Sequence, residues 1–159
     1  MYSKEELKLL RKEFWDTFGK RCDIVPELRE KRKKWLLHRT GIPNVDLKFE
    51  AGRNDAKVIL EINHQSESRR LKTFEILEKY KPLLEDGFDD GLIWDFCHIR
   101  EDSGQMVCRI YTMLPGIDFH KRSHWPYIFN FLIDNMLTLQ TNFLEIKEMV
   151  SHEIENYYE

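Results

Sequence analysis

The last quarter of the chain carries the sequence pattern that most constrains the fold. From about Ser123 onward, apolar residues recur at alternating spacings of four and three positions, which is typical of one face of a long amphipathic helix. The residues of this series are Trp125, Phe129, Leu132, Met136, Leu139, Phe143, Ile146 and Val150. Other apolar residues flank the series and widen it beyond a coiled-coil seam, so we expect the helix to pack on its own core. Its far end is a candidate surface for a homodimer.

Two further helices are predicted upstream of this one. Ser3 and Glu6 have the spacing of a capping box, and apolar residues with a helical period follow them. We expect this first helix to stop at Gly19. Ser66 is a candidate cap for a central helix whose helical period continues to Leu84.

Strands are predicted where apolar and polar residues alternate between turn residues. They span residues 45–50, 57–64, 92–100 and 105–113, with residues 35–38 as a candidate fifth. The first two should be antiparallel neighbours, and a polar hairpin loop joins the last two. The chain is therefore expected to form a single α+β domain over residues 1–159. Its mixed or antiparallel sheet of four to five strands would combine with an N-terminal helix, a central helix and a long C-terminal helix.

Composition narrows the class of protein. Hydrophobic residues make up 42% of the chain and charged residues 33%, which is enough apolar material for a core and argues against disorder. The three cysteines lack the spacing of a zinc or redox motif, which favours a reducing compartment. No stretch is long and apolar enough for a membrane span, and the N-terminus lacks the apolar centre of a signal peptide. We expect a cytoplasmic protein without a membrane partner.

Positive charge is concentrated near the N-terminus. Residues 1–40 contain 12 Lys and Arg against 7 Asp and Glu, although the whole chain has a net charge of −3. The densest run comprises Arg29, Lys31, Arg32, Lys33 and Lys34. Such a run can neutralise phosphates and is the candidate nucleic-acid-binding segment, with a solvated face or loop as the alternative.

The first two strands contain a candidate for metal-dependent nuclease chemistry. Restriction-endonuclease-like sites need acidic residues on neighbouring strands to hold Mg²⁺, and a lysine two positions after the second acid. Asp46 and Glu61 match the acids, but Asn63 stands where the lysine belongs. The alternative, which we prefer, is that the charged residues of these strands form cross-strand ion pairs on a solvated face. They are Asp46, Lys48, Glu50, Lys57 and Glu61.

Other catalytic or metal-binding arrangements have little support. His120 and His124 have ligand-like spacing, but the neighbouring Lys121 and Arg122 would repel a cation. His98 should point away from Asp95, because residues an odd number apart on a strand lie on opposite faces. No nucleophile motif or phosphate loop occurs, so the sequence assigns no catalytic residue, metal or cofactor.

Several short motifs resemble those of a bacterial family known as domain of unknown function 4268. They are Glu13-Phe14-Trp15 with Phe18, Lys34-Trp35, Phe49-Glu50-Ala51 and Gly91-Leu92-Ile93-Trp94. These are core aromatic and turn residues, so the resemblance implies no catalytic residues. Members of that family occur alone or beside nuclease-like domains, which implies a setting near restriction or defence systems.

The sequence thus leaves two functional interpretations. The first is a non-enzymatic interaction module whose partner is nucleic acid or another protein. The alternative is a divergent Mg²⁺-dependent nuclease that uses Asp46 and Glu61.

Overall fold

The computed structural model describes residues 2–25 and 40–158. The candidate strand at residues 35–38 and the basic run from Arg29 to Lys34 lie outside these residues.

An antiparallel sheet of four strands organises the described part of the chain. The strands are β1 (Val45–Ala51), β2 (Asp55–Ile62), β3 (Ile93–Ile99) and β4 (Met106–Pro115). Their order across the sheet is β1-β2-β4-β3, and every neighbouring pair is antiparallel. This confirms the expected α+β class and the pairing of the first two strands.

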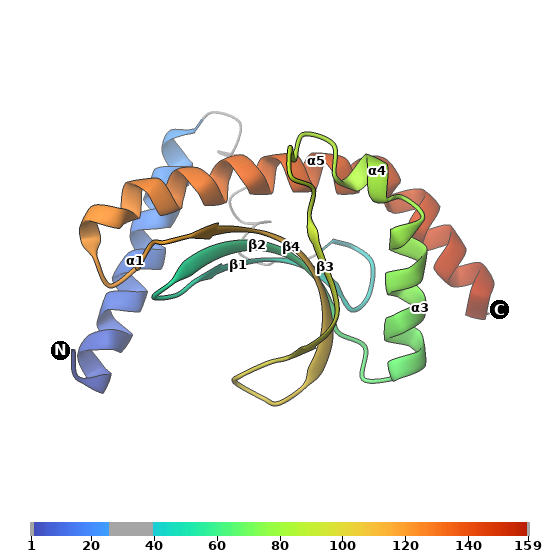
Figure 1. The fold of residues 1–159 in the computed structure, drawn as a ribbon, viewed down its shortest axis with the longest axis horizontal. Coiled ribbons are helices and arrows are strands. Elements are labelled where there is room, and N and C mark those ends of the chain that lie inside the picture. The colour runs from blue at the N-terminus through green and yellow to red at the C-terminus, as the bar shows by residue number, and fades with distance from the viewer. Residues whose placement is uncertain (1, 26–39, 159) are drawn as a thin grey trace.

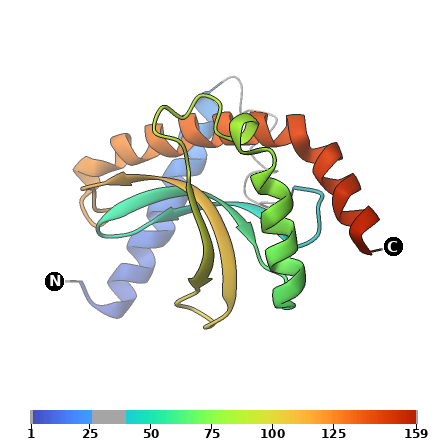
Figure 2. The same ribbon diagram turned by 45° about the vertical axis from the view of Figure 1, so that its right-hand side comes forward.

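Helices cover one side of the sheet and its two ends. They are α1 (Lys4–Ile24), α3 (Glu67–Glu78), the short α4 (Lys81–Leu84) and α5 (Trp125–Tyr158), with a 3-10 turn at Arg122–His124 before α5. Figure 1 shows the sheet as an arch, with α5 along its outer side and α1 and α3 at opposite ends. In Figure 2 the hairpin of β3 and β4 curls away from α5. We call the side of the sheet that faces away from α5 the concave face.

Two of the predicted helix boundaries were wrong. The first helix does not stop at Gly19 but continues to Ile24, and both Gly19 and Cys22 are buried in its packing face. Tertiary contacts there outweigh the weak helix propensity of glycine. The central helix breaks near Tyr80, because Pro82 lies in the first turn of α4 and has no amide to continue the preceding helix. The capping box at Ser3 and Glu6 is present as predicted.

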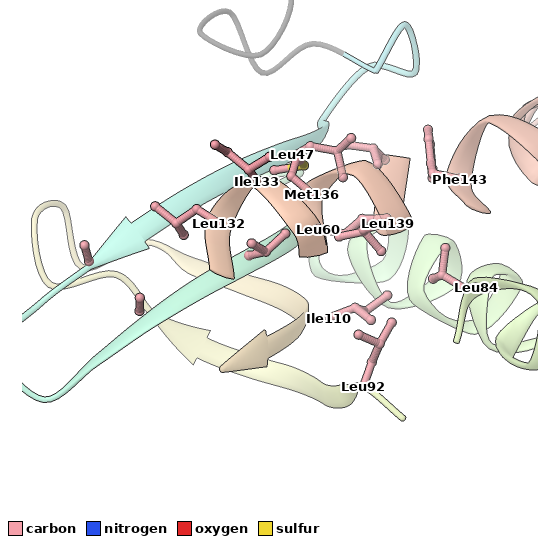
Figure 3. Packing of buried hydrophobic residues seen from close by; sticks show 14 of the residues in the cluster. Leu47, Leu60, Leu84, Leu92, Ile110, Leu132, Ile133, Met136, Leu139 and Phe143 are labelled. Atoms are coloured by element: carbon pink, nitrogen blue, oxygen red, sulfur yellow. The ribbon is translucent and has the colours of Figure 1, made fainter. Parts of the chain in front are cut away.

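The apolar series of α5 forms the centre of the core. All eight of its predicted residues are buried. Figure 3 shows Leu132, Ile133 and Met136 beside Leu47 and Leu60 of the sheet, with Leu139 near Ile110. The eight residues therefore pack inside the fold of the chain itself, as expected for a core helix. No helix in the described ranges is long and apolar enough to cross a bilayer.

One polar residue of α5 ties the central helices to this core. The Asn142 side chain is buried and donates to the backbone oxygens of Leu84 at 2.9 Å and Asp86 at 2.7 Å. Leu84 is the last residue of α4 and Asp86 follows it, and backbone oxygens at a helix end lack partners within the helix.

Substituting Asn142 with leucine, which is similar in volume, should lower the free energy of unfolding by about 1.5 kcal/mol, because both carbonyls lose their donor. Urea denaturation measures the change. Asn135→Ala is the matched control, since Asn135 donates only to Phe131 of its own helix. Equal effects of the two substitutions would contradict this role of Asn142.

Candidate functional site

Strand alternation brings the charged side chains onto the concave face. Leu47, Leu60 and Ile110 face α5, so their neighbours Lys48, Glu61 and Arg109 point the other way. Two adjoining hollows lie on this face, one of about 330 Å³ and one of about 710 Å³. We call them together the concave groove.

Arg100 lines both hollows of the groove. The smaller hollow is also lined by Lys48, Phe49, Glu50, Lys57, Glu61, His98, Glu101, Asp102 and Arg109. The larger contains Asn44, Asn63, His64, Arg69 and Gln105.

Glu61 is the central anion of the groove. It is only 2% exposed, and its Oε1 accepts hydrogen bonds from Lys48 at 2.8 Å, from Asn63 at 3.2 Å and from Arg100. Burial alone would raise the pKa of this carboxyl. The bonds from Arg100, Lys48 and Asn63 outweigh burial and hold the pKa below its usual value. Glu61 is therefore ionised at neutral pH and anchors two cations on the concave face.

Arg109 is the most enclosed cation of the groove. It is 4% exposed, and its guanidinium bonds Glu50 Oε2 at 2.5 Å and lies 3.1 Å from His98 Nε2. Burial, followed by the positive charge of Arg109, lowers the pKa of His98, which favours a neutral ring that accepts from the guanidinium. The Nε of Arg109 is buried and has no hydrogen-bond partner. Buried donors are usually paired, so Arg109 Nε is a donor that an incoming acceptor could still use.

The position of His98 corrects a prediction from simple alternation. A β-bulge interrupts the pairing of β3 with β4, so that Asp95 pairs with Arg109 and His98 pairs with Val107. Val107 and Arg109 are two residues apart and share a face, so Asp95 and His98 share that face as well. The extra residue of the bulge reverses the side of the sheet on which His98 lies.

The two candidate nuclease acids lie directly opposite each other. Asp46 pairs with Glu61 in the register of β1 and β2, and the Asn63 amide donates to Asp46 at 2.8 Å and to Glu61 at 3.2 Å. Lys48 supplies a cation to Glu61 from the neighbouring strand. As arranged, the residues do not fit an Mg²⁺ ion, because Glu61 Oε1 is already surrounded by three donors, two of them cationic.

The preferred alternative for these strands was right about two cross-strand ion pairs and about the exposure of Glu50, and wrong about the exposure of Glu61. Lys48 pairs with Glu61, and Lys57 lies 3.7 Å from Glu50. Glu61 is nevertheless buried, because long side chains from β1 and from the β3–β4 hairpin close over it.

The histidines near the start of α5 have structural contacts. His124 Nδ1 accepts from the backbone of Asp118 at 3.0 Å, and the His120 ring packs on Phe119 and Tyr2. Within residues 2–25 and 40–158, no group of three or more His, Cys, Asp or Glu side chains is placed to hold a metal ion.

Sequence reasoning missed Arg109, Arg100 and His98. One signal for Arg109 was available, because it is the only charged residue in β4, where its neighbours predict a buried strand. Arg100 lies at the end of a strand next to a polar loop, and nothing in the sequence shows that it reaches Glu61 on another hairpin.

Comparison with known protein families places the chain in one of them. The model of the family described as domain of unknown function (DUF4268) matches residues 10–147. The chain belongs to this family. The match includes all four strands and most of α1 and α5, so the concave groove lies within the part that defines a DUF4268 domain. No curated protein and no solved structure shows a significant similarity to the chain.

Proposed function

We propose that this DUF4268 domain is a non-enzymatic interaction module that binds nucleic acid, with phosphates received in the concave groove. The observation that carries the proposal is Arg109, a nearly fully buried guanidinium that faces the groove and has an Nε without a partner. An arginine in this setting suits phosphate, because its planar donors match phosphate oxygens in pairs.

Other cations extend the same surface. Lys48, Lys57 and Arg100 line the smaller hollow, and Arg69 lines the larger one. The larger hollow has no acidic residue in its lining. In the smaller hollow these cations lie beside four acidic residues, Glu50, Glu61, Glu101 and Asp102. A phosphate backbone that passes from one hollow to the other would therefore pair with the cations of the smaller hollow and meet only Arg69 and Arg100 as charged residues in the larger one, and contacts of this kind are the basis of sequence-independent binding.

The basic run from Arg29 to Lys34 is proposed as a second contact. Lys34 precedes Asn44 by ten positions, and Asn44 lines the larger hollow. The basic run is therefore close in sequence to a residue at one end of the groove.

A salt titration tests the proposal. Binding of short labelled single-stranded and duplex oligonucleotides would be followed by fluorescence anisotropy at increasing salt. We expect log Kd to rise linearly with log salt concentration, and Lys57→Gln to reduce this slope by about one. Lys12→Gln is the control, because Lys12 is an exposed residue of α1 paired with Asp16.

A variant with glutamine in place of Arg29, Lys31, Arg32, Lys33 and Lys34 should reduce the slope of log Kd against log salt concentration further. The absence of salt-dependent binding to any of the oligonucleotides would remove the proposal.

A nuclease is the second candidate, because Asp46 and Glu61 lie directly opposite each other, although Glu61 would have to release Lys48 and Arg100 before it could hold a metal ion. Incubation of plasmid with the protein and Mg²⁺ or Mn²⁺ distinguishes it from a binding module. The informative variant is Asp46→Asn, because Glu61 also holds Lys48 and Arg100, so its loss would disturb the fold. Cleavage that this variant abolishes would establish the enzyme.

A homodimer through the far end of α5 is a separate proposal. Leu144 and Met149 are exposed on that helix at 54% and 44%. Light scattering at micromolar concentration should then give twice the mass of the chain, and a strictly monomeric mass would remove this proposal.

A further inference from the structure

Glu50 is the least enclosed of the charged side chains that meet around Arg109. Its side chain is 47% exposed, whereas that of Arg109 is 4% exposed and that of Lys57 is 17% exposed. Glu50 Oε2 accepts from Arg109 at 2.5 Å, and its Oε1 lies 3.7 Å from Lys57 Nζ. One half-exposed carboxylate thus lies between two enclosed cations.

Each of the two cations has contacts besides Glu50, and one of them is Asp55, whose Oδ2 lies 4.0 Å from Lys57 Nζ. The Arg109 guanidinium contacts His98 and lies 6.0 Å from the centre of the Tyr111 ring, and Lys57 lies 5.3 Å from the same ring. Glu50 is on β1, at the edge of the sheet, and its side chain is half-exposed. Rotation of the Glu50 side chain into water would therefore leave the cations in position, at the modest cost of a half-exposed ion pair.

The position of the Glu50 carboxylate is one that a phosphate can take. Both groups present anionic oxygens to a guanidinium fork and an ammonium, and phosphate offers more oxygens and more charge. Arg109 Nε, which Glu50 leaves without a partner, is a further donor on the same guanidinium. A phosphate has enough oxygens to bond Nε as well.

We propose that Glu50 occupies a phosphate site formed by Arg109 and Lys57, and that an incoming phosphate displaces it. This inference rests on the groove of the proposed function and assigns one subsite within it. Glu50 acts there as an internal competitor, which weakens the binding of anions and discriminates against those too weak to displace it.

The test compares phosphate binding by variants at constant ionic strength, with chloride as the balancing anion. Isothermal titration with inorganic phosphate should give about fivefold tighter binding to Glu50→Gln than to the native protein, because the competing charge is gone while the amide oxygen still accepts from Arg109. Lys57→Gln should bind phosphate at least about threefold more weakly. Thermal melts of each variant establish that it is folded.

Glu13→Gln is the matched control. Glu13 pairs with Arg122 on the surface, with side chains 50% and 58% exposed, and lies outside the groove. Its substitution should leave phosphate binding unchanged. Equal or weaker phosphate binding by Glu50→Gln would overturn the assignment of the subsite.

A parallel titration with a short oligonucleotide separates the two proposals. Tighter phosphate binding by Glu50→Gln, with no oligonucleotide binding by any variant, would support the subsite and contradict the proposed function. Oligonucleotide and phosphate binding that Glu50→Gln leaves unchanged would support the function and contradict the subsite.

Discussion

Replacing Phe14 with alanine should lower the free energy of unfolding by about 4 kcal/mol, the largest effect we expect from a single substitution. The Phe14 ring is fully buried. It makes edge contacts with Trp15, Phe119 and Trp125 at centroid distances of 4.9, 5.8 and 5.3 Å and lies 5.1 Å from Phe129. Alanine would leave a cavity where α1, α5 and the segment after β4 meet.

Urea denaturation followed by circular dichroism measures this loss. The control is Leu9→Ala on the same helix, where the leucine is 67% exposed and a change below about 0.5 kcal/mol is expected. A loss of less than about 1.5 kcal/mol for Phe14→Ala would mean that α1 is not docked as the structure has it.

Glu61→Gln should lower the free energy of unfolding at neutral pH by about 3 kcal/mol, because charge-assisted bonds to Lys48 and Arg100 are lost within the groove. Lys48 and Arg100 are 31% and 23% exposed and can partly rehydrate, which keeps the effect below that of Phe14→Ala.

The effect of Glu61→Gln on the free energy of unfolding should depend on pH. The folded-state pKa of Glu61 lies below its ordinary value of 4.5, so its contribution to stability is complete above that pH and is lost as pH falls through the lowered pKa. The difference in stability between the native protein and Glu61→Gln should therefore be constant near neutral pH and narrow below about pH 4.5.

Denaturation at a series of pH values tests this dependence. Asp16→Asn, which removes an exposed surface pair, should have an effect below about 0.5 kcal/mol throughout. A difference for Glu61→Gln that stays the same down to acidic pH would show that the charge of Glu61 is not what stabilises the groove.

Long periodic patterns predicted the fold well. The apolar series of α5 extends over about seven helical turns, so local exceptions did not obscure it. The alternation in β1 and β2 gave their correct pairing. The boundary at Gly19 failed because the preference of one residue was outweighed by the packing of α1. Tertiary contacts can outweigh the local preference of a residue at a helix end.

The groove could be predicted only in part. Alternation placed Asp46 and Glu61 on one face, but the burial of Glu61 depends on side chains from a second hairpin. Simple alternation also predicted that His98 and Asp95 lie on opposite faces of the sheet, whereas the bulge in β3 places both on the concave face. Both the burial of Glu61 and the orientation of His98 depend on how strands from different hairpins pair and curve. The alternation of residues along one strand does not predict that.

The most direct test of the central claim is an NMR titration of the isotopically labelled protein with a short oligonucleotide. We predict that the changes in amide and arginine side-chain resonances will be concentrated on the concave face, at Lys57, His98, Arg100 and Arg109. Resonances of the outer side of α5, such as that of Leu144, should remain unperturbed. Changes confined to α1 and α5, or no changes at all, would contradict the account.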